Sequence, residues 1–405
     1  MMTGRTTVVE YRGRAAVNGY STAVSLHSHT NRSNEIMSSV PGYLERIPVV
    51  APLARREMLR YTRRNGQPAD FTKGWWRPPV SPQTVWDSET QQIVEVLGLR
   101  PLISITDHDS IDAALELRRT KASQCTAISF EWTVPYHHSF FHVGVHNLRA
   151  ESAAALFGAL SAYTLGVDRG CLSELLDRIN EDREALVILN HPLWDLPQIG
   201  AANHFALLRR FLHDHGNKIH ALELNGYRSW HENSSVITLA AARSLPTISG
   251  GDRHGCEPNS LLNLTAAESF GDFVREVRER HHSVVLVMPQ YRQSLVARKL
   301  RVAADAMRQS PAYPPGQQRW TDRVSYESKG VVRPLSDQWP TGGPLWVRSA
   351  VRLFCLGTSA PLLPVLLTLV WLAGAATSDR GGPSSFMEDD DSVPQTSASY
   401  SELAE

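Results

Sequence analysis

Histidines and carboxylates recur where short apolar segments of the sequence end. In chain order they are His27 and His29 after TAVSL, Asp107, His108 and Asp109 after PLISIT, Glu131 after AISF, His142 within FFHVGV, His191 after ALVILN, and Asp252 and His254 after PTISG. Imidazole and carboxylate without thiolate are typical ligands of Mn, Fe or Zn in catalytic sites, whereas structural zinc sites use cysteine. The pattern therefore predicts one metal site assembled from several strand ends.

The spacing within these groups suits shared cations. His27 and His29 lie two residues apart, so on an extended strand end both imidazoles point to the same side. Asp252 and His254 repeat this arrangement. Glu131 can bridge two cations, and two divalent cations about 3.5 to 4 Å apart form the usual clamp for in-line displacement at phosphorus. We therefore expect hydrolysis of a phosphate ester.

The elements that must hold these residues alternate along the chain. Short β-rich segments are separated by helical patterns near residues 89–98, 111–120, 172–181, 205–215, 234–243 and 270–281. This alternation is typical of a parallel α/β sheet or barrel. Polar residues at the carboxyl ends of seven candidate strands favour a closed, somewhat irregular α/β barrel over residues 20–290.

One long segment, residues 38–82, interrupts the alternation between the first and second strands. Trp75 and Trp76 are adjacent in it, and its basic residues are Arg55, Arg56, Arg60, Arg63, Arg64, Lys73 and Arg77. The segment has three interpretations: a solvated surface, a lid that meets an anionic substrate, or a patch that contacts acidic lipid headgroups.

The C-terminal quarter differs in composition. Residues 291–352 predict a helix followed by a linker rich in Pro and Gly. Residues 353–378 contain no charged residue and are long enough to cross a membrane as one helix. Pro361 and Pro364 lie within this stretch, and membrane helices tolerate proline better than soluble ones. A buried core helix is the alternative. Arg348 and Arg352 precede this predicted transmembrane helix, and the acidic residues 379–405 predict a disordered tail.

The bulk composition indicates a compartment and gives no support to nucleic acid as a general partner. Lys+Arg and Asp+Glu both total 41, so no general attraction to nucleic acid is expected. The four cysteines include no C-x-x-C pair, and the first twenty residues contain no apolar run, which favours a reducing compartment. We therefore expect a single-pass membrane protein whose catalytic domain faces the cytoplasm.

Six motifs in the same order resemble those of the PHP (polymerase and histidinol phosphatase) family. They are LHSHTNRS, ITDHDSI, FEW, FHVGVH, NHP and GGDRHG, within residues 22–255. The TDHDS-type second motif is similar to the small-molecule phosphoesterase branch of this family. The resemblance implies a distorted (βα)7 TIM-like barrel with two or three divalent metal ions (Mn, Zn or Fe), and hydrolysis of a small phosphorylated substrate by a metal-activated hydroxide.

The resemblance also implies a ligand set for each metal. The first would be His27, His29, Glu131 and Asp252; the second Glu131, His142 and His191; and the third His108, His254 and a residue shortly after the first motif. That last residue is usually Asp or His in the family, but this chain has Asn34, with Glu35 as a neighbouring substitute. His137, His138 and His146 lie close enough in sequence to compete with His142.

Four residues have expected roles in catalysis or in orienting the ligands: His254, Arg253, Asp107 and Asp109. His254 or a metal-bound water would protonate the leaving group, and Arg253 or a basic residue of the insertion would hold the phosphoryl group. Asp107, like Asp109, would orient ligands.

Two other functions remain open at the level of sequence. Asn34 is the feature that favours a membrane-anchored module that binds a metal or phospho-ligand without turnover. A nucleic-acid exonuclease has less support, because no basic and aromatic stacking surface stands out apart from the insertion.

Overall fold

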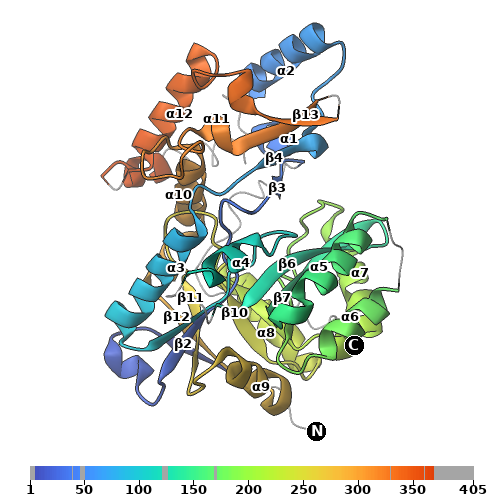
Figure 1. Cartoon of the computed structure of the whole chain (residues 1–405). Coiled ribbons are helices and arrows are strands. Elements are labelled where there is room, and N and C mark those ends of the chain that lie inside the picture. The colour runs from blue at the N-terminus through green and yellow to red at the C-terminus, as the bar shows by residue number, and fades with distance from the viewer. Residues whose placement is uncertain are drawn as a thin grey trace.

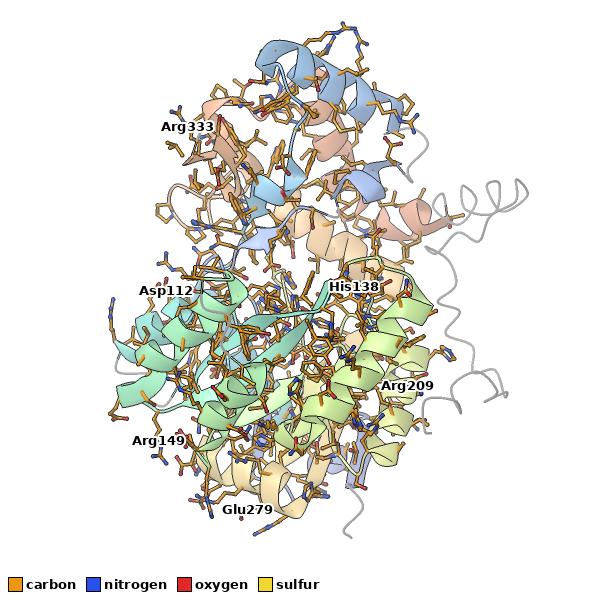
Figure 2. All side chains as sticks on the ribbon, turned by 90° about the vertical axis from the view of Figure 1, so that its right-hand side faces the viewer. Asp112, His138, Arg149, Arg209, Glu279 and Arg333 are labelled. Atoms are coloured by element: carbon orange, nitrogen blue, oxygen red, sulfur yellow. The ribbon has the colours of Figure 1, made fainter. Side chains whose placement is uncertain are left out.

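The computed structural model describes residues 5–38, 40–45, 51–120, 126–167, 171–328, 330–359 and 361–368. A larger body, which holds two five-stranded sheets, lies below a smaller region built around a four-stranded sheet (Figure 1). We call the smaller region the cap. In the view turned by 90°, Arg333 of the cap and Glu279 of the body lie at opposite ends of the molecule (Figure 2).

The first sheet of the body mixes parallel and antiparallel strands. Its order is β1-β12-β11-β2-β5, with β1 Arg5–Glu10, β12 His282–Val287, β11 Leu261–Thr265, β2 Thr22–Ser25 and β5 Arg100–Ile103. β2 runs parallel to β5, while β11 runs antiparallel to both β2 and β12. Every residue of β2 and β11 is buried, so these strands form the interior of the sheet.

The second sheet has the order β10-β9-β8-β7-β6. Its strands are β10 Thr247–Gly250, β9 Ala221–Asn225, β8 Leu186–Leu189, β7 Ser139–Leu148 and β6 Ile128–Tyr136. The run from β8 to β10 is parallel, but β6 and β7 form an antiparallel hairpin and β7 is antiparallel to β8. The seven predicted strands are therefore present as β2, β5 and β6 to β10.

The two sheets do not close into the predicted (βα)7 barrel. Among the described residues, no strand of one sheet pairs with a strand of the other. Two isolated β-bridges join the sheets, one from Ser28 to Arg253 and one from His108 to Glu131. The physical reason is the pairing: β2 uses one edge for the antiparallel strand β11 and the other for β5. The fold is thus a mixed α/β fold whose two sheets meet just beyond the carboxyl ends of β2, β5 and β10.

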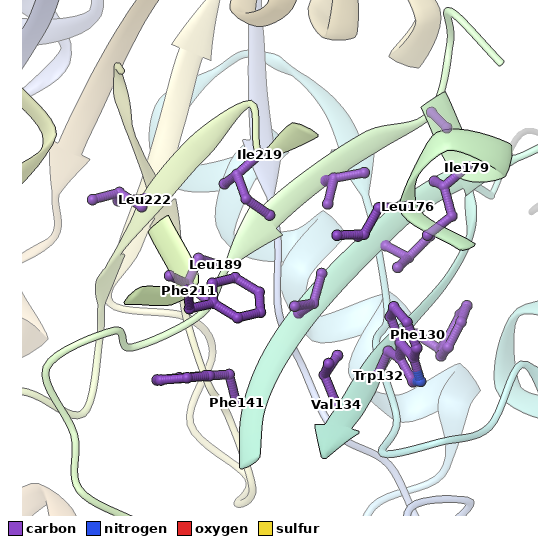
Figure 3. Close-up of a cluster of buried hydrophobic side chains, with 14 of the residues drawn as sticks. Phe130, Trp132, Val134, Phe141, Leu176, Ile179, Leu189, Phe211, Ile219 and Leu222 are labelled. Atoms are coloured by element: carbon purple, nitrogen blue, oxygen red, sulfur yellow. The ribbon is translucent and has the colours of Figure 1, made fainter. Parts of the chain in front are cut away.

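Helices cover the sheets from outside (Figure 1). In the body they are α3 Pro82–Gln91, continued by a π-helical turn Gln92–Leu97, then α4 Asp112–Arg118, α5 Ala150–Thr164, α6 Leu172–Asn180, α7 Ala201–His215, α8 Trp230–Ala242, α9 Phe270–Arg280 and α10 Leu295–Met307. α6 illustrates the pattern, because its apolar residues recur at helical spacing and bury Leu172, Leu175, Leu176 and Ile179. Figure 3 shows Leu176 and Ile179 of this helix packed with side chains of β6 to β9.

The cap joins the insertion to the C-terminal extension. Its sheet has the order β14-β13-β4-β3, with β14 Val331–Pro334, β13 Val324–Ser328, β4 Gly74–Trp76 and β3 Glu35–Ile36. Its helices are α1 Val40–Glu45, α2 Ala51–Asn65, α11 Trp320–Arg323 and α12 Leu345–Gly357. Residues 310–344 therefore differ from the loosely packed linker that their composition predicts, because β13 pairs with β4 of the insertion.

The C-terminal helix also differs from its prediction. α12 begins at Leu345, before the predicted start, and ends at Gly357; residues 363–368 are helical again after a break. Pro361 and Pro364 lack the amide proton that a continuing helix needs, so one unbroken helix from Leu353 is wrong. Among the described residues, no helix is long and apolar enough to cross a membrane. Residues 369–378 and the acidic tail 379–405 lie outside the described residues, and membrane attachment stays a prediction.

The core around α7 gives a first prediction. Phe211 is fully buried, with its ring centroid 4.9 Å from that of Phe141 and 5.2 Å from that of Tyr136. Phe211→Ala should lower the free energy of unfolding by about 3–5 kcal/mol, because it leaves a cavity in this packed cluster. Denaturant unfolding measures the loss. The control is Leu165→Ala, whose side chain is 76% exposed and should cost less than about 0.5 kcal/mol. Equal losses would contradict this account of the core.

Candidate metal centre

The predicted ligands come together where the two sheets meet. His27 and His29 follow β2, His108 follows β5, His191 follows β8, and Asp252 and His254 follow β10, while Glu131 and His142 lie on β6 and β7. His27, His191 and Asp252 have positive φ angles of 60°, 29° and 52°. Such backbone is costly for residues other than glycine and tends to persist at functional sites. Here it turns the chain sharply after each strand.

Glu131 lies at the centre of the group. Its Oε2 is 3.1 Å from Nε2 of His27, 3.4 Å from Nε2 of His29 and 3.2 Å from Nδ1 of His108. Its Oε1 is 3.2 Å from Nδ1 of His142 and 3.2 Å from Nε2 of His191. The carboxylate is fully buried, and its one negative charge is surrounded by five imidazoles from four different chain segments.

Three sets of ligand atoms are close enough to hold a cation each. They are His27, His29 and Asp252; His108, Glu131 and His142; and His29, Glu35, His108 and His254. The sets share residues, which is the arrangement expected when neighbouring cations are bridged by common ligands. All atoms are oxygen or imidazole nitrogen, a donor set that suits Mn, Zn or Fe.

The hydrogen bonding of Glu131 fits metal ligation. Its Oε2 accepts no hydrogen bond within the described part of the chain, although three imidazole nitrogens lie within 3.4 Å of it. A buried carboxylate oxygen without a partner is costly. Nitrogens and an oxygen that crowd together without hydrogen-bond geometry are instead arranged to share a cation. The residues present therefore fit a divalent metal.

Glu35, rather than Asn34, enters the third set. Side chains on a strand alternate in direction, and at β3 the alternation leaves Asn34 and Ile36 exposed and buries Glu35. Oε2 of Glu35 is 3.1 Å from Nε2 of His108, and its Oε1 is 3.4 Å from Nε2 of His254. Oδ1 of Asn34 instead accepts a hydrogen bond from Arg77. The cap sheet thus supplies a carboxylate where the sequence motif has an amide.

Glu223 orients two of the predicted ligands and was missed by the sequence analysis. One of its oxygens contacts Nδ1 of His27, and the other accepts a hydrogen bond of 2.7 Å from the backbone N–H of His191. A carboxylate on Nδ1 leaves Nε2 of His27 free to bind a metal. The available signal was a lone carboxylate in the apolar strand ALELN, since buried acids are rare unless paired.

Asp107 holds the loop that carries His27 and His29. It accepts hydrogen bonds from the backbone N–H of Thr30, at 2.5 Å, and from the Thr30 hydroxyl, at 2.8 Å. Burial raises the pKa of Asp107 to about 7, and these hydrogen bonds oppose the rise. Asp109 is similar in kind, because it accepts a hydrogen bond from the backbone N–H of Thr133. A role of either aspartate in orienting metal ligands stays a prediction.

Arg253 does not face the site. Its Nη1 donates to Oε1 of Glu89 and to Ser88, each at 2.7 Å, and its other nitrogens donate to the carbonyls of Gly255 and Cys256. The expectation that Arg253 holds a phosphoryl group is therefore corrected. Its guanidinium is fully buried and fully engaged within the protein.

The histidines that could compete with His142 lie elsewhere. His137 and His138 form the exposed turn between β6 and β7 (Figure 2). His146 is buried, and its Nδ1 is 2.7 Å from the hydroxyl of Ser104. Neither the turn nor His146 contributes to the three sets of ligand atoms, whereas His142 does.

Charges within the cluster shift several pKa values. Burial lowers the pKa of His108, but Glu35 and Glu131 outweigh burial and raise it to about 10. At His27, burial is likewise outweighed by Glu131, Glu223 and Asp252, and the pKa lies well above its ordinary value. His29 differs, because burial and the adjacent His254 lower its pKa to about 3. The cluster therefore carries bound protons that cations would replace.

The insertion closes one side of the centre. The ring of Trp76, on β4, lies with its centroid 5.9 Å from that of His254. Arg77, the next residue, donates to Asn34 at 3.2 Å. Of the three interpretations of residues 38–82, this position favours a lid at the site for the β4 portion.

Comparisons with known proteins give only distant similarity. No protein-family model and no curated protein matches the chain. An amidohydrolase from Chromobacterium violaceum, with bound sulfate and no metal, is 13% identical over 57% of this chain and 87% of that chain, with a TM-score of 0.33. A Bifidobacterium adolescentis protein, provisionally described as a metal-dependent phosphoesterase, is 15% identical over 50% of this chain and 91% of that chain, with a TM-score of 0.32. Similarity this low assigns no activity.

The geometry of β3 predicts that Glu35, and not its neighbour Asn34, binds metal. Glu35→Gln should reduce the metal content by about one ion per chain, because the third set loses its charged oxygen. Asn34→Ala is the matched control and should leave the content unchanged, since Asn34 contacts Arg77. Elemental analysis of protein reconstituted with Mn²⁺ measures both. Loss of metal in Asn34→Ala alone would contradict this placement.

Metal binding should release protons. His108 and His27 hold protons at neutral pH because their pKa values are raised, and a cation requires the neutral imidazoles. Affinity should therefore fall as the pH is lowered from about 8 to about 6, and binding near neutral pH should release about one or two protons. Titration calorimetry in two buffers of different ionisation enthalpy counts them. Binding without proton release would show that the cations lie elsewhere.

Proposed function

We propose that this protein is a metal-dependent phosphoesterase that hydrolyses a small phosphate ester. The observation that supports the proposal most is Glu131, a buried carboxylate whose two oxygens lie 3.1–3.4 Å from five imidazole nitrogens. A carboxylate shared in this way is suited to hold two cations at the separation used for displacement at phosphorus.

Each oxygen of Glu131 belongs to a different side of the centre. On the Oε2 side lie His27, His29 and Asp252, with His108, His254 and Glu35 beside them. On the Oε1 side lie His142 and His191. Cations held there would supply Lewis acidity, which activates water and offsets the charge that develops on phosphoryl oxygens.

His254 fits a ligand better than a proton donor. Its Nδ1 is 2.8 Å from the backbone carbonyl of Asp252, and a carbonyl only accepts, so Nδ1 carries the proton in the neutral ring. Nε2 then faces Glu35 with its lone pair, as a metal ligand does. We therefore place His254 in the third set of ligand atoms and assign no proton transfer to it.

The alternative of a binding module without turnover loses its main support. That alternative rested on Asn34 at a position where the resembling family has an acid or a histidine. Glu35 offers a carboxylate to the same two histidines, His108 and His254. The donor set is therefore complete enough for three cations, and we retain hydrolysis as the proposed activity.

The test is release of inorganic phosphate from a panel of phosphate esters by the full chain with Mn²⁺. Chelation should abolish activity, and added Mn²⁺ should restore it. Glu131→Gln should lower kcat by at least about 10³-fold, because the shared ligand loses its charge. His138→Gln, at an exposed turn, is the control and should keep full activity. Failure of the wild-type protein, fully loaded with metal, to hydrolyse any ester of the panel would refute the proposal.

A further inference from the structure

One buried arginine, Arg228, has no acceptor among the described residues. Four arginines are at most 9% exposed among the described residues: Arg228, Arg253, Arg298 and Arg323. Arg253 pairs with Glu89, Arg298 donates to the carbonyls of Gly226 and Gln293, and Arg323 donates to three backbone carbonyls. Within the part of the chain that the structure describes, the guanidinium of Arg228 makes no hydrogen bond and no ion pair, and its Nε is buried without a partner.

Such an arrangement is costly for a folded protein on its own. A buried charge without an opposite charge or hydrogen-bond acceptors loses its hydration and regains little. The guanidinium carbon of Arg228 does lie 3.7 Å from the ring centroid of Trp194. Stacking on an aromatic face leaves the in-plane N–H donors of an arginine unused. Arg228 is therefore held in place and still lacks a partner for those donors.

Trp194 connects Arg228 to the metal centre. Trp194 follows His191 by three residues. The backbone N–H of Trp194 donates to the backbone carbonyl of His191, and the centroids of the two side-chain rings are 5.2 Å apart. Arg228 itself lies between β9 and α8, next to Ser229, which caps the first turn of α8. The N-terminus of a helix adds a further preference for negative charge.

We propose that Arg228, stacked on Trp194, binds an anionic group of the substrate next to His191. The inference rests on the proposed phosphoesterase function and adds a recognition residue to it. The planar guanidinium matches the oxygens of a phosphate or carboxylate through two parallel hydrogen bonds. The anion is either the reacting phosphoryl group or a second anionic group of the same molecule. In both cases the substrate supplies acceptors that Arg228 lacks among the described residues.

Binding of inorganic phosphate to the full chain tests the proposal without turnover. Arg228→Met should weaken phosphate binding by about 10- to 100-fold in titration calorimetry, the value of one charge-assisted interaction. Arg228→Lys keeps the positive charge but not the planar guanidinium, so its phosphate affinity should lie between those of the wild type and Arg228→Met. Unchanged phosphate affinity in both variants would overturn the proposal.

Thermal unfolding without phosphate separates recognition from a structural role. Arg228→Met should unfold at a temperature no lower than the wild type, because it removes an unpaired charge. Arg323→Met is the matched control and should unfold at a clearly lower temperature, since three backbone carbonyls lose their donor. Equal destabilisation by the two substitutions would show that Arg228 is structural and would overturn the proposal.

Kinetics locate the anion. If Arg228 holds a second anionic group, Arg228→Met raises KM about 10-fold or more for esters that carry one, and leaves simple monoesters unchanged. If it holds the reacting phosphoryl group, kcat/KM falls for both kinds of ester. Equal kcat/KM for wild type and variant on every ester would overturn the proposal. Absence of all hydrolysis would refute the proposed function, while phosphate affinity would still decide the role of Arg228.

Discussion

The negative charge of Glu131, buried where the two sheets meet, is the constraint on which the arrangement of this molecule depends. Removing a carboxylate from water costs several kcal/mol unless opposite charges replace its hydration. Two of the five imidazoles around Glu131, those of His27 and His108, provide part of that replacement as protonated groups, and cations would provide more. The positive φ angles at His27, His191 and Asp252 are strained backbone conformations that turn those side chains towards Glu131.

A second set of residues keeps the inner residues in place. Glu223 contacts the ring of His27 and the backbone of His191, and so links the ends of β2 and β8. Asp107 holds Thr30 and thereby the segment after His29. Arg253 and Glu89 form a buried ion pair between the β10 end and α3. Catalytic centres need ligands held to a fraction of an ångström, and polar contacts of this kind supply that restraint.

Local pattern was enough to find the strands and most of the residues that cluster around Glu131, but not the partners that lie far apart in sequence. Alternating segments marked β2 and β5 to β10, and polar residues at their ends marked Glu131 and its histidines. The pairing of β2 with β11, which prevents closure of the barrel, joins segments more than two hundred residues apart. The same limit hid the pairing of β4 with β13 and the inward turn of Arg253 towards Glu89.

The cap reaches the metal centre through one short strand, β3, which carries Glu35. β13 pairs with β4, and β4 pairs with β3, so the C-terminal extension braces the strand that carries Glu35. β4 also places Trp76 beside His254, on the Oε2 side of Glu131, whereas Trp194, on which Arg228 stacks, lies beside His191 on the Oε1 side. In the proposed enzyme a substrate therefore meets the cap at one end and an unpaired guanidinium at the other. The metal centre of the body would then determine the reaction, while Trp76 of the cap and Arg228 would determine which ester is accepted.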